Sequence, residues 1–248
     1  FHTRNYVGRS GKIYVGTKQG YAEKGDKSKY PGGYLITYDP RNDTARNLGM
    51  PYKKQGIADV VADESRDLIY VVTCEDQHWM LYDVATKKFT ELGPMLTPYA
   101  TTLMDAEGKA HALTKDFQLA TYDPTTKKVT QRPIEIGGKP FVRESRSAIP
   151  TWNLDPDGRT AWLILMNDAF LLSIDLYSKG KKAKGLNHGL MLKGERPDSR
   201  SALTIAPDGK IYTLISVENT TGFGKGKLHH LCCYDPKKRR HEDLGVLA

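Results

Sequence analysis

One short pattern recurs five times along the 248-residue chain, and it limits the fold more than any other feature. Each copy has a turn, usually with Gly or Asp, followed by an apolar run and then by a second apolar run that ends in Asp. Gly between two apolar runs is typical of a β-hairpin, because such turns need a positive φ. The second runs of the five copies are residues 35–39, 80–83, 119–123, 172–175 and 232–235.

Each copy also contains the sequence of two further strands, so that every repeat has four. A more polar fourth strand is predicted after each of these aspartates, at residues 44–48, 89–92, 129–133, 183–186 and 241–244. We expect the Asp to cap the intervening turn through its side chain. Four strands per repeat favour radial blades over a solenoid. The predicted fold is therefore all-β, a β-propeller with five four-stranded blades in one domain, with repeats at about 1–55, 56–98, 99–143, 144–198 and 199–248.

The stretch Ile69-Tyr70-Val71-Val72-Thr73, leading to Leu81-Tyr82-Asp83, resembles the YVTN and Kelch-like repeats of bacterial propellers. The resemblance extends over all five repeats and implies the fold, but its motif residues hold turns and sheets and imply no chemistry. The chain starts on an inner strand at residues 4–7 and stops on the edge strand of the fifth repeat. This arrangement favours a natural protein of six or seven blades, and five blades closing by face packing alone are the alternative.

The formal net charge of +8 favours a polyanionic partner such as an acidic polysaccharide or another anionic ligand. Nucleic acid is an unfavoured partner, because the charge is spread along the chain and no nucleic-acid motif occurs. No apolar run approaches the ~20 residues of a membrane span. Cys74, Cys232 and Cys233 form no disulfide framework and are predicted to be buried fillers. Neither the cysteines nor five of the histidines have the spacing of metal ligands; these histidines are His78, His111, His188, His229 and His230. No metal or cofactor is therefore predicted.

Candidate ligand-binding residues lie where inner strands begin and where second strands connect to third strands, since both meet at one face of a propeller. Three inner strands open with an arginine, and two long loops, at 18–33 and 218–227, carry lysines and aromatic residues. Arginine suits carboxylates and sulfates because it offers paired donors in one plane. The predicted ligand-binding residues are Arg4, Arg146, Arg200, Tyr21 and Lys225. The alternative is that each arginine only pairs with an acidic residue of the same face, from the set Glu75, Asp76, Asp116, Asp168 and Glu218.

Secreted bacterial propeller enzymes include polysaccharide lyases, in which Arg neutralises a uronate carboxylate while His or Tyr moves protons. His2 and Tyr99 are expected to share the channel mouth with Arg4, and this position alone makes them candidate catalytic residues. The leading hypothesis is an extracytoplasmic propeller, periplasmic or secreted, that binds a uronate or sulfated carbohydrate, with lyase activity left open. A non-catalytic scaffold that docks a protein partner is the main alternative, and a sensor for a small metabolite is a third.

Overall fold

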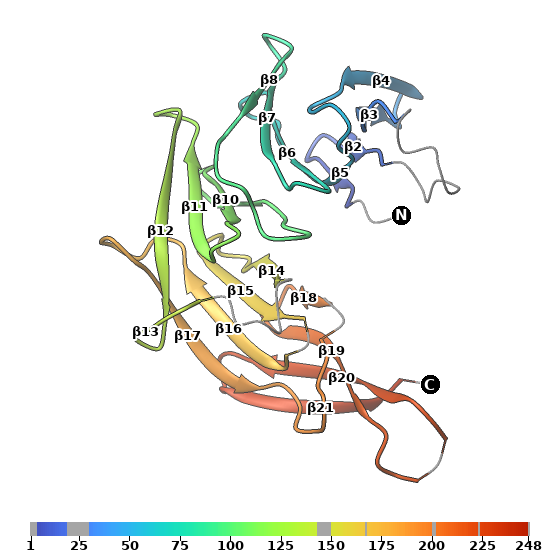
Figure 1. Cartoon of the computed structure of the whole chain (residues 1–248), viewed down its shortest axis with the longest axis vertical. Helices are drawn as coiled ribbons and strands as arrows, with labels where there is room; N and C mark the ends of the chain where they lie inside the picture. The colour runs from blue at the N-terminus through green and yellow to red at the C-terminus, as the bar shows by residue number, and fades with distance from the viewer. Residues whose placement is uncertain are drawn as a thin grey trace. The chain divides into compact units, whose positions relative to one another are not determined.

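The computed structural model describes residues 4–18, 30–142, 150–166, 168–199, 202–222 and 224–247. These residues form strands and turns, and no helix occurs among them (Figure 1). Consequently, this part of the chain has no helix that could cross a membrane. The chain divides into two compact units. The first contains Phe1–Lys115 with Ala120–Gln131, and the second contains Asp116–Leu119 with Arg132–Ala248. The prediction that all repeats form one domain stays a prediction.

Each predicted repeat contains its four predicted strands in the predicted order, and the third repeat adds a short fifth strand. The first two repeats form separate antiparallel sheets in chain order: β1 (Tyr6–Val7), β2 (Ile13–Gly16), β3 (Leu35–Asp39) and β4 (Thr44–Gly49), then β5 (Ile57–Asp63), β6 (Leu68–Thr73), β7 (Trp79–Asp83) and β8 (Lys88–Glu91). The fifth repeat forms another: β18 (Leu203–Ile205), β19 (Ile211–Glu218), β20 (Lys227–Asp235) and β21 (Arg240–Val246).

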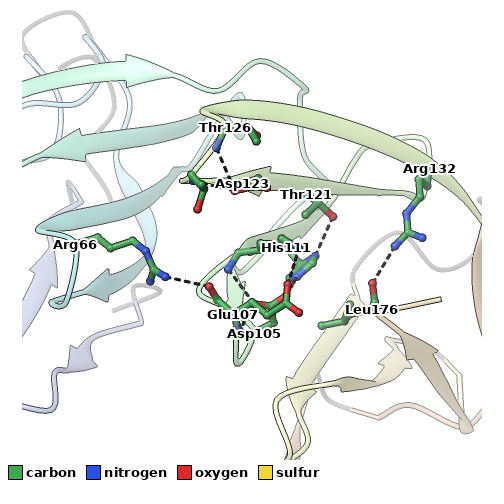
Figure 2. A network of polar contacts seen from close by, with 11 residues as sticks. Arg66, Asp105, Glu107, His111, Thr121, Asp123, Thr126, Arg132 and Leu176 are labelled. Atoms are coloured by element: carbon green, nitrogen blue, oxygen red, sulfur yellow. Dashed lines mark hydrogen bonds and ion pairs between the residues drawn. The ribbon is translucent and has the colours of Figure 1, made fainter. Parts of the chain in front are cut away.

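The third and fourth repeats share one sheet, which corrects the prediction of five separate sheets. The third contains β9 (Leu103–Met104), β10 (Ala110–Leu113), β11 (Gln118–Asp123), β12 (Lys128–Ile136) and the short β13 (Lys139–Pro140), and the fourth contains β14 (Pro150–Leu154), β15 (Thr160–Leu165), β16 (Phe170–Asp175) and β17 (Ala183–Leu190). Strand β12 runs past its predicted end at Pro133, and Ile134 there pairs in parallel with Ala183. The extension is stabilised because Ile134 is buried and Arg132 donates a 3.0 Å hydrogen bond to the carbonyl of Leu176 (Figure 2).

The predicted turn caps are confirmed in all five repeats. The aspartate that ends each third strand accepts a backbone N–H from the turn, over 2.8–3.1 Å: Asp39 from Arg41, Asp83 from Thr86, Asp123 from Thr125, Asp175 from Tyr177 and Asp235 from Lys237. Backbone hydrogen bonds favour the ionised carboxylate, and they hold the pKa of Asp83 and Asp123 below the usual value. The repeated Asp is therefore a turn residue.

Apolar residues of neighbouring sheets pack face to face within each unit. Strand β6 shows the pattern most clearly. Ile69 and Val71 belong to the core shared with the first repeat. Tyr70 and Val72, on the opposite face, belong to the core shared with the third repeat. In the second unit, Trp162 and Tyr234 belong to the core between the fourth and fifth repeats. The three tryptophans, Trp79, Trp152 and Trp162, are buried on strands and contribute to this packing. The three cysteines are buried free thiols, as predicted.

Candidate functional site

A buried carboxylate, Asp59, lies near the start of the inner strand β5. Every residue of that strand is buried, and Asp59 stands between apolar neighbours on both sides. Its Oδ2 accepts a 2.8 Å hydrogen bond from the backbone N–H of Thr102. Burial disfavours the charged form and raises the pKa of Asp59 to about 6, although the positive charge of Arg4 acts in the opposite direction. Such a displaced pKa marks a candidate functional residue.

Arg4 lies beside this carboxylate, just before β1. Its backbone N–H donates to the carbonyl of Ala58 over 2.9 Å, which fixes the start of the first inner strand against β5. The Nε atom lies 4.0 Å from Oδ1 of Asp59, at the outer limit of an ion pair. The Arg4 side chain is 52% exposed, whereas that of Asp59 is 4% exposed. Its guanidinium donates no hydrogen bond to the residues that the structure describes.

The start of the third inner strand joins the same site through Thr102. The Thr102 hydroxyl accepts a 3.2 Å hydrogen bond from Nε1 of Trp79, while its backbone N–H binds Asp59. Tyr99, three residues earlier, is 50% exposed and has a φ of 56°, which is rare for a large side chain. The structure therefore brings the segments of Arg4 and Tyr99 together around a carboxylate that the predictions did not include.

Lys18, the first lysine of the loop at 18–33, is already paired. Its Nζ lies 3.3 Å from Oε1 of Glu75, whose Oε2 accepts the backbone N–H of Gly56 over 2.9 Å. Beside them, the side chains of Gln55 and Asp76 are joined by a 2.7 Å hydrogen bond. These two acids of the second repeat are therefore engaged by Lys18, Gly56 and Gln55 and by no described arginine. Arg4 differs from Lys18, because its carboxylate neighbour is Asp59 rather than one of the five loop acids considered.

Five other predicted site residues are not brought to this site by the described part of the structure. His2, Tyr21, Arg146 and Arg200 lie outside the described residues. Lys225 is exposed in the loop between β19 and β20. The convergence of three arginines on one ligand therefore stays a prediction.

A buried histidine of the third repeat is held on both sides. His111 Nε2 lies 2.9 Å from Asp105 Oδ2, and its Nδ1 lies 2.9 Å from the hydroxyl of Thr121 (Figure 2). Asp105 also accepts the backbone N–H groups of Glu107 and Lys109. Burial alone would raise the pKa of Asp105, but the hydrogen bonds to its charged form hold it below the usual value. This cluster closes a turn and supports packing.

A serine–histidine pair in the second unit is also part of the packing. Ser173 Oγ lies 2.8 Å from Nε2 of His188, and His188 Nδ1 lies 3.1 Å from the hydroxyl of Tyr234. Burial lowers the pKa of His188, and the rings of Trp162 and Tyr234 surround it. Ser173 is buried, so the pair offers no open surface for a substrate. Nowhere in the described part of the chain do three or more His, Cys, Asp or Glu residues group closely enough to hold a metal ion.

Sequence reasoning missed Asp59, although the sequence contained a signal. In the run Ile57-Ala58-Asp59-Val60-Val61-Ala62, one carboxylate interrupts an otherwise apolar inner strand. A charged residue at such a position must either find partners or change its protonation, and both outcomes suggest a role beyond packing.

These features define a class: an all-β protein of repeated antiparallel four-stranded units, with a fold like that of β-propeller proteins. No protein-family model matches the chain, and no curated protein matches it. The periplasmic gluconolactonase PpgL of Pseudomonas aeruginosa has a similar structure, with a TM-score of 0.61 at 11% identity over 98% of this chain and 69% of PpgL.

Two further solved structures resemble the chain. TolB of Acinetobacter baumannii has a TM-score of 0.54 at 12% identity over 96% of this chain. An auxiliary nutrient binding protein of Bacteroides thetaiotaomicron has a TM-score of 0.52 at 12% identity over 94% of this chain. The chain spans about half the length of each, 53% in both cases. At such identities the likeness shows the fold alone.

Proposed function

We propose that this protein is an extracytoplasmic β-propeller that binds an anionic carbohydrate, a uronate or sulfated sugar, through Arg4. One observation carries the proposal. Arg4 presents a half-exposed guanidinium, with no hydrogen bond to a described residue, where the inner strands of three repeats begin. A carboxylate or sulfate matches the planar pair of donors that this group offers.

Proteins of similar structure support the extracytoplasmic location in this proposal. PpgL is named as a periplasmic enzyme, and another similar structure is the extracellular domain of a hybrid two-component system, with a TM-score of 0.55 at 14% identity. The nutrient binding protein supports a ligand-binding role. In the proposal each four-stranded repeat is one blade, and Tyr21, Arg146, Arg200 and Lys225 remain predicted contacts of the ligand.

Asp59 gives the proposed site a dependence on pH. The neutral carboxyl leaves Arg4 available for the acidic group of the sugar. The ionised carboxylate repels that group and competes for Arg4. Because burial raises the pKa of Asp59 to about 6, the neutral form is present in mildly acidic solution.

The lyase version of the proposal assigns proton transfer to Tyr99, with His2 as a second candidate from the sequence. A neutralised uronate carboxylate acidifies the adjacent C–H, so that a nearby phenol or imidazole can remove the proton. Incubation with polygalacturonate, followed at ultraviolet wavelengths, tests this version. Appearance of the unsaturated product in wild type, but not in Tyr99→Phe, supports it. Flat absorbance removes it and leaves the binding proposal.

Calorimetric titration with galacturonate oligosaccharides and heparin fragments tests the binding proposal, with neutral galactose oligosaccharides of equal length as ligand controls. We expect Arg4→Gln to weaken binding of the acidic ligand by about tenfold or more, the value of a charge-assisted hydrogen bond. Lys88→Gln, which removes an exposed charge at the start of β8, is the matched control and should not change affinity. Absence of acidic-sugar binding by wild type would overturn the proposal. A protein partner captured equally by wild type and Arg4→Gln would then favour the scaffold alternative.

A further inference from the structure

Basic residues collect in the turns that join third and fourth strands, away from the loops considered for the candidate site. In the second unit the two such turns and the strand starts that follow them hold eight, all of them exposed. We name these eight the basic edge: Lys179, Lys181, Lys182, Lys184, Lys237, Lys238, Arg239 and Arg240.

Most of this charge is not neutralised by the described residues. Lys182 pairs with Glu135, and Arg240 Nη2 lies 3.2 Å from Oε2 of Glu242. The other six form no ion pair with a described residue. The two aspartates that end the preceding strands, Asp175 and Asp235, are engaged by backbone N–H groups of the turns. The carboxylates nearest in sequence therefore serve to shape the turns.

The two turns belong to repeats that pack directly on each other within one unit. Nε2 of His241, near the start of β21, lies 2.7 Å from the backbone carbonyl of His188 on β17. Because a carbonyl can only accept, His241 is the donor of this hydrogen bond. The ring of Tyr234 contacts His188, with centroids 5.3 Å apart. The charge of Arg239 is close enough to add to the effect of burial and of His241 in lowering the pKa of His188. The first turn directly precedes the start of β17, whereas the second turn lies beside His188, towards the end of the same strand. A partner that engages both turns must therefore extend along β17.

The chemistry of the turns favours a hydrophilic polymer as the partner. Leu176 is buried, and Tyr177 is half-buried with the guanidinium of Arg159 lying 5.5 Å from its ring centre. The two turns therefore expose no large apolar side chain that could enter a membrane and no open aromatic face for base stacking. Spaced lysines instead act as point charges that suit a repeating anion.

We propose that the basic edge is a docking surface for a linear acidic polysaccharide. It would hold the polymer by charge, without reading individual sugars. The inference does not depend on Arg4, which lies in the other unit, although the same class of ligand would engage both.

Retention on immobilised heparin along a salt gradient tests the proposal. The test variant changes Lys179, Lys181, Lys237 and Lys238 to Gln, and the matched control changes the exposed Lys53, Lys115, Lys139 and Lys193 to Gln. Both lose the same net charge, so the comparison separates a local surface from overall charge. We expect the test variant to bind heparin about tenfold more weakly at physiological salt and to show a shallower salt dependence, while the control changes by less than about threefold. Equal losses in the two variants would overturn the proposal.

Two further arms identify the partner and separate this inference from the proposed function. Vesicles of phosphatidylserine and phosphatidylcholine, and single-stranded DNA, should bind more weakly than heparin at equal charge; equal or tighter binding would overturn the assignment to a polysaccharide. The lysine test variant should bind short galacturonate oligosaccharides as tightly as wild type does, whereas Arg4→Gln should weaken that binding, so a failure of one proposal can be told apart from a failure of the other. Thermal melting of both lysine variants should match that of wild type. If the test variant melts early, the pair Lys237→Gln with Lys238→Gln alone takes its place, with about half the effect expected.

Discussion

Two buried aspartates of the same unit, Asp59 and Asp105, behave in opposite ways. Burial raises the pKa of Asp59 to about 6 against the opposing charge of Arg4, whereas hydrogen bonds hold the pKa of Asp105 below its usual value. Asp105 binds a histidine and two backbone N–H groups over 2.9 Å each. Asp59 accepts a hydrogen bond from the backbone N–H of Thr102, and Nε of Arg4 lies 4.0 Å from its Oδ1.

The difference shows that burial alone does not decide what a carboxylate does. A carboxylate with enough donors is stabilised as an anion and becomes part of the framework. One with too few donors is destabilised as an anion, and it remains available for chemistry or for a ligand. We therefore assign Asp105 to the fold and Asp59 to the candidate site.

The largest expected effect is that of Asp105→Ala, which removes a buried acceptor and leaves His111 and two N–H groups without it. We expect the free energy of unfolding to fall by about 3 kcal/mol or more at pH 7. Denaturant titration measures the change. Asp157→Ala, at an exposed turn, is the control and should cost much less. A loss below about 1 kcal/mol for Asp105→Ala would break the distinction between the two aspartates.

The second prediction concerns Asp59→Asn, which keeps an oxygen for the N–H of Thr102 and removes the charge. The pKa of Asp59 is higher in the folded protein than in the unfolded chain. Protonation therefore favours the folded state, and stability from this group is lost as pH rises from about 4 to above 6. The variant should be more stable than wild type by about 2 kcal/mol at pH 7.5.

At pH 4 most of that advantage should disappear, because Asp59 is then protonated in the folded protein and only partly ionised in the unfolded chain. Denaturant curves of the two proteins at both pH values give the comparison. A variant less stable than wild type at pH 7.5 would show that Asp59 is a framework residue like Asp105.

A smaller effect is expected for Thr121→Val, which keeps the shape of the side chain but removes the hydroxyl beside Nδ1 of His111. The histidine nitrogen would then be buried without its partner, and we expect a loss of about 1–2 kcal/mol. Thermal or denaturant unfolding measures it. Thr126→Val, at the turn that follows β11, serves as the control. No difference between the two variants would mean that the hydroxyl contributes nothing to the Asp105 cluster.

The smallest effect on stability is expected for Arg4→Gln. The side chain is half exposed and its ion pair with Asp59 is long, so its removal should change the free energy of unfolding by less than about 0.5 kcal/mol. The same variant should weaken binding of acidic sugars. A large loss of stability together with unchanged binding would place Arg4 in the framework.

Much of the fold was predictable because the repeats encode it locally. The five aspartates that end third strands cap turns as expected, since an Asp side chain can bind the N–H groups two or three residues later without help from distant residues. The joined sheet was not predictable, because the parallel pairing of Ile134 with Ala183 connects two repeats and depends on how they meet.

The site was predictable only in part. The position of Arg4 at an inner-strand start followed from the repeat, but its neighbour did not. The acids considered for Arg4 lay in loops on one face, whereas Asp59 lies within a strand of the next repeat. Which buried acid meets which arginine is set by packing between repeats, and strand periodicity carries no information about that contact.

The pH dependence of galacturonate binding tests the central claim, that Arg4 and Asp59 form the ligand site. The ligand carboxylate remains ionised between pH 5 and pH 8. Wild-type affinity should therefore rise several-fold as pH falls through about 6, because the neutral Asp59 no longer competes for Arg4. Asp59→Asn should bind tightly across the whole range. Equal affinity of wild type at both pH values, or the same pH dependence in Asp59→Asn, would contradict the claim.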